Sequence, residues 1–265
     1  MTLPQLTHLL QTALEGKTVD LERYLVEHSN LPGARMNLAV VNAFADSVGS
    51  TIMQSSPPVE ALEDLLDRWA ADDAPVNEPR VILPCAAVLS YGQAAVSRPD
   101  WWEDEIARLY RAASDQRWRV REIVAMALQR MLAADWERTA AVLTTWAGDG
   151  DPLVIRAAAA GVAEPPLLNS QVRGEDAVSI QKKAVEQFGA IPADSRRSES
   201  VRTLRKALGF TVSVAVAAAP DRGFKLLEQL AASDDDDLRW IVRENLKKNR
   251  LKPWADRVAA IQAML

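Results

Sequence analysis

Apolar residues recur at helical spacing along nearly the whole chain. In residues 62–69, leucines and a tryptophan three or four positions apart form one face, and charged residues fill the other. Asp135, Asp151 and Asp221 each precede a similar run, where an aspartate side chain can accept hydrogen bonds from the first amide groups of a helix. Prolines and glycines separate segments of about 10–20 residues. The pattern predicts about 14 helices and no sheet.

Three places depart from this regularity. Residues 210–216 alternate as a strand does, but no second strand is available to pair with them, so we predict a buried helix there. Pro84 and Gly161 lie within apolar helical patterns, and each is expected to bend its helix.

An internal repeat indicates the period of the helices. Residues 115–122 (DQRWRVRE) and 237–244 (DLRWIVRE) agree at six of eight positions and lie 122 residues apart. That separation equals three periods of about 41 residues, the size of a paired-helix repeat. Looser copies of the motif occur at 154–156 and 201–202. Arginines also recur at positions 35, 80, 121, 156, 202 and 243, with intervals of 35 to 46 residues.

The repeated motif has a structural interpretation. The aspartate that opens each copy is expected to cap a helix, and the valine is expected to begin the buried stripe. Arg121 and Arg243 follow that valine. Their aliphatic stems can cover apolar surface while their guanidinium groups meet the acidic turn of a neighbouring repeat. Such contacts would hold the repeats together.

An acidic turn, a valine–arginine pair and an alanine-rich helix that repeat near 40 residues resemble HEAT repeats. The resemblance is clearest over residues 101–168 and 221–251. It implies an all-α fold: a right-handed α-α superhelix, or HEAT-like solenoid of the armadillo type, with about six helical pairs and residues 1–265 in a single domain. It also implies a non-enzymatic scaffold whose concave helical face recognises a macromolecular partner, in the first place a protein.

A narrower resemblance concerns DNA repair. Residues 146–149 (WAGD), 154–156 (VIR) and 164–167 (EPPL) are similar to bacterial HEAT-like proteins grouped with the AlkD-type DNA alkylation repair family. That family holds DNA in a basic concave groove and places tryptophans and an aspartate beside the damaged nucleotide. This chain departs from it at Ile155 and near Glu164, where positive charge is usual. DNA binding, with or without glycosylase activity, is the alternative function.

The predicted binding residues come from the repeat and the arginine series. They are Trp118, Arg121, Arg156, Arg202, Trp240 and Arg243. Tryptophan and arginine suit the recognition of peptides and of nucleic-acid backbones, although both tryptophans could instead pack on the preceding turn. Glu122 lies four positions after Trp118, on the same helix face, and is the catalytic candidate of the repair alternative. A tryptophan and a glutamate with the same spacing recur at 240 and 244. This recurrence favours a structural role for the pair in the repeat, and we therefore predict no catalytic residue.

Few residues are suited to catalysis or to metal binding. The 265 residues include two histidines, His8 and His28, and one cysteine, Cys85. Neither histidine has the spacing of a zinc site. No GxGxxG or GxxxxGK[ST] motif marks a phosphate-binding loop. We therefore expect no metal, no small-molecule cofactor and no Ser-His-Asp or Cys-His site.

Charge is unevenly distributed. Residues 1–159 contain 14 Lys and Arg against 22 Asp and Glu, whereas residues 160–265 contain 17 against 14. This asymmetry indicates either solvated helix faces, or a polyanion or acidic partner that meets the second part. The net charge of −5 disfavours non-specific nucleic-acid binding. The single thiol, and the lack of a signal-peptide pattern or a membrane-length apolar run, lead us to expect a cytoplasmic protein with no membrane partner.

Overall fold

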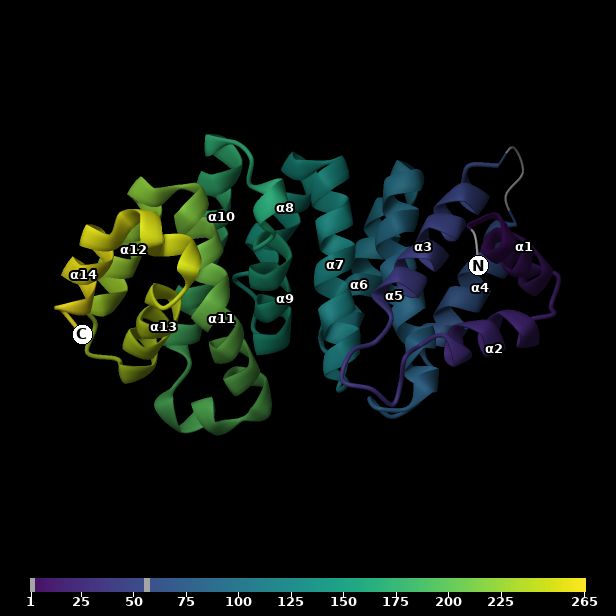
Figure 1. Cartoon of the computed structure of the whole chain (residues 1–265), viewed down its shortest axis with the longest axis horizontal. Helices are drawn as coiled ribbons and strands as arrows, with labels where there is room; N and C mark the ends of the chain where they lie inside the picture. Colours follow the sequence, from purple (N-terminus) through teal and green to yellow (C-terminus); the bar gives the residue numbers. More distant parts are fainter. Residues whose placement is uncertain (1–2, 55–57) are drawn as a thin grey trace. The chain divides into compact units, whose positions relative to one another are not determined.

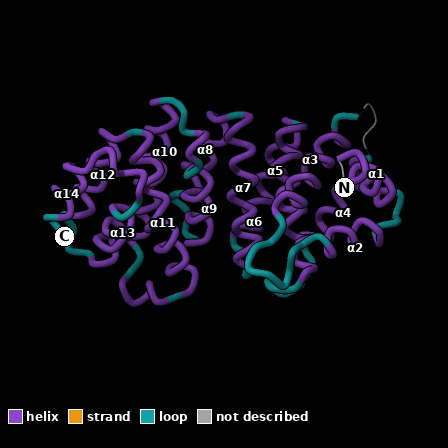
Figure 2. Tube along the Cα trace, in the orientation of Figure 1, coloured by secondary structure: helices purple, strands orange, loops and turns teal. Residues whose placement is uncertain are grey.

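The computed structural model describes residues 3–54 and 58–265. Over these residues it contains fourteen α-helices, five short 3₁₀ segments and no strand (Figure 1, Figure 2). The all-α prediction is therefore confirmed. The chain divides into two compact units, Met1–Ala134 and Asp135–Leu265.

The first unit is built from two layers of helices. Its helices are α1 (Leu3–Leu14), α2 (Val19–Glu27), α3 (Leu38–Ile52), α4 (Val59–Ala70), α5 (Ile82–Ser97), α6 (Trp102–Ala113) and α7 (Trp118–Ala134). Helices α1, α3, α5 and α7 pack each against the next and form one layer. Helices α2, α4 and α6 pack against α5 from the second layer. The pairs α4–α5 and α6–α7 each contribute one helix to each layer.

Helix α5 is the centre of the first unit. Its residues 82–92 are all buried, because α3 and α7 flank it within its layer and α4 and α6 cover it. A helix enclosed on all sides carries apolar residues all round rather than in one stripe. Pro84 lies in its first turn, where a backbone N–H has no partner within the helix. The expected bend at Pro84 is therefore not required.

Helices α5 and α7 approach each other closely at Gly92. A Cβ atom on Gly92 would lie 2.8 Å from the Cβ and from the carbonyl oxygen of Ala127. Packed interiors hold no space for contacts this short. The absence of a side chain at Gly92 therefore sets the spacing of the two helices.

We expect Gly92→Ala to lower the free energy of unfolding by about 2 kcal/mol, because the added methyl group meets the backbone of α7 and not a movable side chain. Gly150→Ala is the control, since nothing lies within 4 Å of its Cβ position. Guanidinium denaturation measures both variants. Equal stability of the two would contradict a spacing set by Gly92.

The second unit repeats the two-layer arrangement. Its helices are α8 (Trp136–Trp146), α9 (Pro152–Val162), α10 (Gln171–Ala190), α11 (Glu199–Ala218), α12 (Pro220–Ala231), α13 (Asp236–Leu246) and α14 (Ala255–Gln262). Helices α9, α11 and α13 form one layer and α8, α10 and α12 the other, with α14 against α12 and α13 at the end. The strand-like residues 210–216 lie in α11, and six of the seven are buried, so the prediction of a buried helix is confirmed. Gly161 is the penultimate residue of α9, which leaves little helix for it to bend.

A buried asparagine links α13 to α11. Asn245 has no exposed surface. Its Oδ1 accepts a hydrogen bond from the Ser213 N–H at 2.7 Å, and its Nδ2 donates to the carbonyl oxygens of Leu208 and Ile241, both at 2.8 Å. Because a buried amide must find partners for both of its ends, these bonds fix the register of the two helices.

A buried glutamine makes a second connection of this kind. Gln181 of α10 donates to the carbonyl oxygen of Ala159 in α9 at 2.7 Å and accepts a hydrogen bond from the Thr211 hydroxyl of α11 at 2.9 Å. One side chain thereby joins three helices from two successive repeats.

The predicted repeat is visible in the positions of the arginine series. In the first unit, each arginine of the series lies within or just before a helix of the layer that α3, α5 and α7 form. In the second unit, each lies within a helix of the layer that α9, α11 and α13 form. Arg35 and Arg80 precede α3 and α5, and the other four lie within α7, α9, α11 and α13. The 122 residues between the two motif copies span three helix pairs. The helical repeat and its period are therefore confirmed.

Of the three aspartates outside the repeated motif that were predicted to cap helices, two are confirmed as caps. Asp135 accepts a hydrogen bond from the Arg138 N–H at 3.1 Å, and Asp151 accepts one from the Leu153 N–H at 2.8 Å. The third prediction is wrong, because α12 begins at Pro220 and Asp221 lies within its first turn.

The two motif copies differ in their helical setting. Trp118 is the first residue of α7, whereas Trp240 is the fifth residue of α13. Asp237 consequently lies inside α13 and does not cap it, contrary to the prediction. The cap is Asp235, whose Oδ1 accepts hydrogen bonds from the N–H groups of Asp237 and Leu238.

Arginines connect neighbouring repeats. Arg108 of α6 pairs with Asp67 of α4 at 3.0 Å. Arg196, which precedes α11, pairs with Asp235, which precedes α13, at 2.7 Å. Arg121 donates to two carbonyl oxygens in the loop before its own helix. Contacts between an arginine and a neighbouring acidic turn therefore occur in both units, and the contact expected for Arg121 and Arg243 stays a prediction.

Two features of the predicted solenoid stay predictions: the right-handed twist and the extent of one domain over residues 1–265. None of the helices in the described ranges combines the length and apolar character that a membrane crossing demands.

Candidate binding site

The predicted binding residues differ greatly in exposure. Trp118 is 47% exposed, and Arg202 and the catalytic candidate Glu122 are also exposed. Arg121 and Arg156 are buried, at 7% and 5% exposure. Little of the surface of either side chain is therefore open to a partner.

Trp240 and Arg243 in the second unit are half-buried. The guanidinium of Arg205 stacks over the Trp240 ring at 3.8 Å from its centroid. The ring also lies against α11 at Gly209, where an added Cβ atom would be 3.0 Å away. Trp240 therefore packs α13 on α11, a helix of the neighbouring repeat, whereas the structural alternative from the sequence was packing on the preceding turn.

In the first unit the structure brings Trp118 and Glu122 to the wall of one hollow of about 350 Å³. One wall is the segment that leads into α3, and the other is the first half of α7. Five apolar side chains and three charged ones line most of it: Met36, Leu38, Trp118, Ile123 and Met126, with Arg35, Arg119 and Glu122. We call this site the aromatic hollow.

Large apolar side chains in the aromatic hollow are open to solvent. Leu38 is 43% exposed and Trp118 is 47% exposed. Met36 beside them is buried, so the exposed pair rests on a packed floor. Contiguous exposed apolar surface of this kind, rimmed by polar groups, is typical of interaction sites.

Arg119 holds the two walls of the hollow together. Its Nε donates to the carbonyl oxygen of Val76 at 2.9 Å and its Nη2 donates to that of Gly33 at 3.0 Å. Its guanidinium also stacks over the Trp118 ring at 4.4 Å from the centroid. Because Arg119 is itself buried, the indole is held by a fixed neighbour. The exposed ring is therefore pre-organised before any partner arrives.

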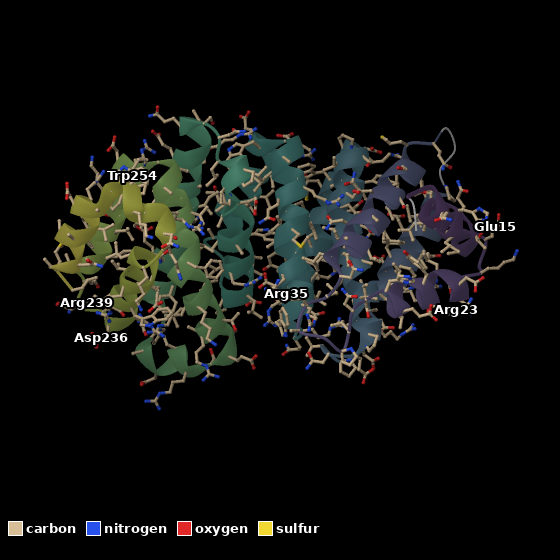
Figure 3. The ribbon with its side chains drawn as sticks, in the orientation of Figure 1. Glu15, Arg23, Arg35, Asp236, Arg239 and Trp254 are labelled. Atoms are coloured by element: carbon tan, nitrogen blue, oxygen red, sulfur yellow. The ribbon has the colours of Figure 1, made fainter. Side chains whose placement is uncertain are left out.

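The rim of the hollow carries one charge of each sign. Arg35, which is labelled in Figure 3, is exposed. Glu122, one turn after Trp118 on α7, is also exposed. A rim with mixed charge favours a partner segment with both polar and apolar groups and gives no preference for a polyanion.

Sequence reasoning identified Trp118 and Glu122 but missed Leu38 and the methionines. Leu38 directly follows Asn37, the N-cap residue of α3, whose side chain accepts a hydrogen bond from the Val40 N–H. A leucine at the first position of a helix has few helical neighbours to cover it. This local signal indicates that Leu38 is exposed. The sequence does not indicate that Leu38 and Trp118, which is 80 residues later, line the same hollow.

The described residues contain no group of three or more His, Cys, Asp and Glu side chains placed to hold a metal ion. The single cysteine, Cys85, is buried in α5, and burial raises the pKa of its thiol to about 12. Such a thiol remains protonated and unreactive at neutral pH. Cys85 is therefore a core residue.

Comparison with known proteins leaves the family open. The chain matches no family model and no curated protein. Among solved structures it is similar to an engineered protein from the Northeast Structural Genomics Consortium, with a TM-score of 0.41, 16% identity and 98% of each chain covered. It is also similar to a designed armadillo repeat protein, with a TM-score of 0.30 and 13% identity over 84% of this chain and 98% of the other. Superpositions this loose add nothing to the fold, which rests on the helix packing within each unit, and the resemblance to AlkD-type proteins stays a prediction.

Proposed function

We propose that the protein is a non-enzymatic helical-repeat scaffold that binds an apolar side chain of a partner protein in the aromatic hollow of its first unit. The observation that carries the proposal is the exposed Trp118 ring, held by Arg119 above a packed floor. Rigid tryptophans in preformed depressions contribute most of the binding energy at many protein interfaces. Two methionines beside the ring allow the surface to adapt to different side chains.

Charge further supports a protein partner. The first unit contains 12 Lys and Arg against 18 Asp and Glu over residues 1–134. An acidic unit repels the phosphates of a nucleic acid, whose binding depends on neutralising them with basic side chains. The binding energy of the aromatic hollow would instead come from the burial of apolar surface.

We expect Trp118→Ala to weaken binding of a selected peptide about 30-fold, because removal of a central tryptophan costs about 2 kcal/mol. Suitable peptides of about 12 residues, roughly 40 Å when extended, come from a displayed random library selected on the wild-type protein. Fluorescence polarisation then measures affinity.

Phe210→Ala is the matched control, since Phe210 is an aromatic residue of the second unit with 45% exposure. It should leave affinity within about twofold of the wild type. Failure to enrich peptides with aromatic or aliphatic residues, or equal losses in both variants, would rule out the aromatic hollow as the binding site.

DNA alkylation repair is the second candidate function, and the shared position of Trp118 and Glu122 in one hollow favours it. A repair protein would place the damaged nucleotide there, with Glu122 as the catalytic carboxylate. Anisotropy titration with plain and abasic-analogue duplexes at two salt concentrations distinguishes the two functions. Salt-dependent duplex binding that Trp118→Ala and Glu122→Gln both weaken would replace the scaffold proposal. Undetectable binding at low salt would remove the repair function.

A further inference from the structure

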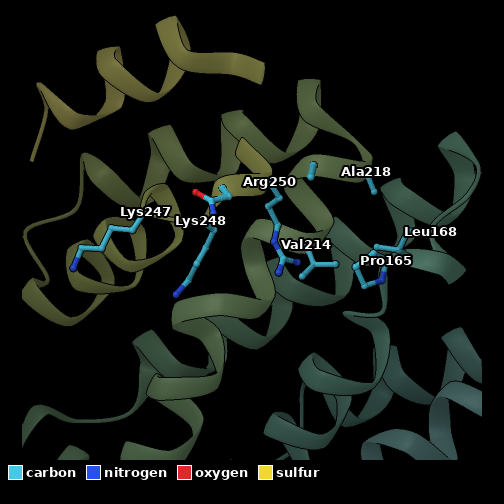
Figure 4. Close-up of a pocket in the computed structure, with 9 residues that line it drawn as sticks. Pro165, Leu168, Val214, Ala218, Lys247, Lys248 and Arg250 are labelled. Atoms are coloured by element: carbon cyan, nitrogen blue, oxygen red, sulfur yellow. The ribbon is translucent and has the colours of Figure 1, made fainter. Parts of the chain in front are cut away.

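A second hollow, of about 640 Å³, lies in the second unit and is lined by three separate segments (Figure 4). Pro165 and Leu168 come from the link between α9 and α10, and the end of α11 forms the floor. The segment directly after α13 forms the rim with residues 247–250. We call this site the basic pocket.

All charged side chains that line the basic pocket are positive. They belong to Lys247, Lys248 and Arg250. Lys247 already pairs with Glu244 at 2.5 Å. Within the described part of the chain, the side chains of Lys248 and Arg250 have neither an ion pair nor a hydrogen bond. In Figure 4 Arg250 extends beside Val214, whereas Lys247 points away from it.

Lys248 and Arg250 differ from the arginines that connect the repeats of this unit, which have acidic partners. Arg196 pairs with Asp235, and Arg205 pairs with Asp237 and stacks on Trp240. The charges of Lys248 and Arg250 are not balanced by any carboxylate among the residues that line the pocket. An anionic group of a ligand would supply that counter-charge. Charge complementarity therefore indicates a negatively charged ligand.

The floor of the basic pocket is apolar. Val214 and Leu168 are buried at 5% and 8% exposure, and Ala217 and Ala218 beside them are half-buried. The methyl groups of this floor offer no hydrogen bonds to a ligand. A complementary ligand therefore carries an apolar group next to its negative charge.

The chemistry of the lining favours a peptide over a nucleic acid. Single-stranded nucleic acids bind to surfaces that supply aromatic rings for base stacking, and no aromatic residue lines the basic pocket. Its positive charges come from one short segment and do not form a strip along the unit. From this we infer that the basic pocket binds an acidic segment of a partner protein, with an aliphatic side chain over Val214 and Leu168 and carboxylates at Lys248 and Arg250. This site is separate from the aromatic hollow.

The test uses fluorescein-labelled peptides of about ten residues, about 35 Å when extended, in which one leucine is flanked on both sides by glutamates. A second set replaces every glutamate by glutamine. Fluorescence polarisation at about 0.15 M salt measures binding to the full chain. We expect the glutamate peptides to bind at least about tenfold more tightly than their glutamine copies.

Two charge-reversal variants locate the binding. Lys248→Glu/Arg250→Glu should weaken the glutamate peptides at least about tenfold. Lys206→Glu/Lys225→Glu changes the net charge equally at two exposed lysines outside the pocket and should leave affinity within about twofold. Circular dichroism verifies that both variants are folded, and Trp118→Ala should bind the peptides as the wild type does.

Several results would overturn the proposal. They are equal affinity for the glutamate and glutamine peptides, equal loss in both double variants, or loss in Trp118→Ala, which would move the peptide to the aromatic hollow. Displacement of the peptide by a short DNA duplex at equal charge concentration would identify the pocket as a nucleic-acid site. None of these results depends on whether the aromatic hollow binds its own partner.

Discussion

Replacing Asn245 by alanine is expected to lower the free energy of unfolding of the second unit by about 3 kcal/mol. The side chain makes three hydrogen bonds at a position without solvent, and each is worth about 1 kcal/mol net. The alanine also leaves a small polar-lined cavity between α11 and α13. Guanidinium denaturation measures the loss, and hydrogen exchange should show faster exchange in α11 and α13 with little change in the first unit.

Asn245→Asp tests whether the bonds or only the volume matter. The carboxylate keeps an acceptor for the Ser213 N–H but turns its other oxygen toward the carbonyl oxygens of Leu208 and Ile241. We expect a larger loss than in Asn245→Ala at neutral pH, with partial recovery in acid, where the protonated group can donate. Asn169→Ala, at an exposed asparagine, is the control. Equal stability of Asn245→Asp and the wild type would contradict the assigned hydrogen bonds.

The helices and their repeat could be predicted from the sequence because their signals are local. Apolar spacing and capping aspartates act within about one helical turn, and the motif at 115–122 and 237–244 recurs within one printed line. The position of each motif copy within its helix could not be predicted. Helix α7 begins at Trp118, the fourth residue of its copy, whereas α13 begins at Asp236, one residue before its copy. Four consecutive aspartates, at 234–237, are available to cap α13, and the cap is Asp235.

The candidate site was only partly predictable because its walls are distant in the sequence. Trp118 was identified from the repeat, but its exposure depends on the segment before α3, which Arg119 ties to α7 through the Gly33 carbonyl oxygen. Arg121 and Arg156 have the same sequence signature as exposed recognition arginines and are nevertheless buried. The identity of an arginine indicates its charge, whereas its burial depends on the segments that pack around it.

A second large effect concerns a buried carboxyl group in the first unit. Glu105 on α6 is 1% exposed, and its Oε1 lies 3.2 Å from Nη1 of Arg108. Burial raises the pKa of Glu105 to about 8, which the Arg108 charge opposes and the nearby carboxylates of Glu63, Asp67 and Asp104 reinforce. The group is therefore mostly protonated in the folded protein at neutral pH.

The pH dependence of stability follows from the raised pKa of Glu105. Between its ordinary pKa of 4.5 and about 8, the folded state binds a proton that the unfolded state has released. Stability from this group is therefore fully present below about pH 4.5 and is lost as the pH rises to about 8, at about 1.4 kcal/mol per pH unit. Above about pH 8 the folded protein must hold a buried carboxylate.

We therefore expect Glu105→Gln to become more stable relative to the wild type by about 3 kcal/mol between pH 6 and pH 9. Glutamine keeps the shape and an acceptor for Arg108 but does not titrate. Denaturation of both proteins at each pH measures the difference, in which the titration of all other groups cancels. Glu60→Gln, at an exposed position of α4, should run parallel to the wild type. If the stability of Glu105→Gln also changed with pH as that of the wild type does, Glu105 would already be ionised at pH 6. The charge of Arg108 would then offset the effect of burial on the pKa of Glu105.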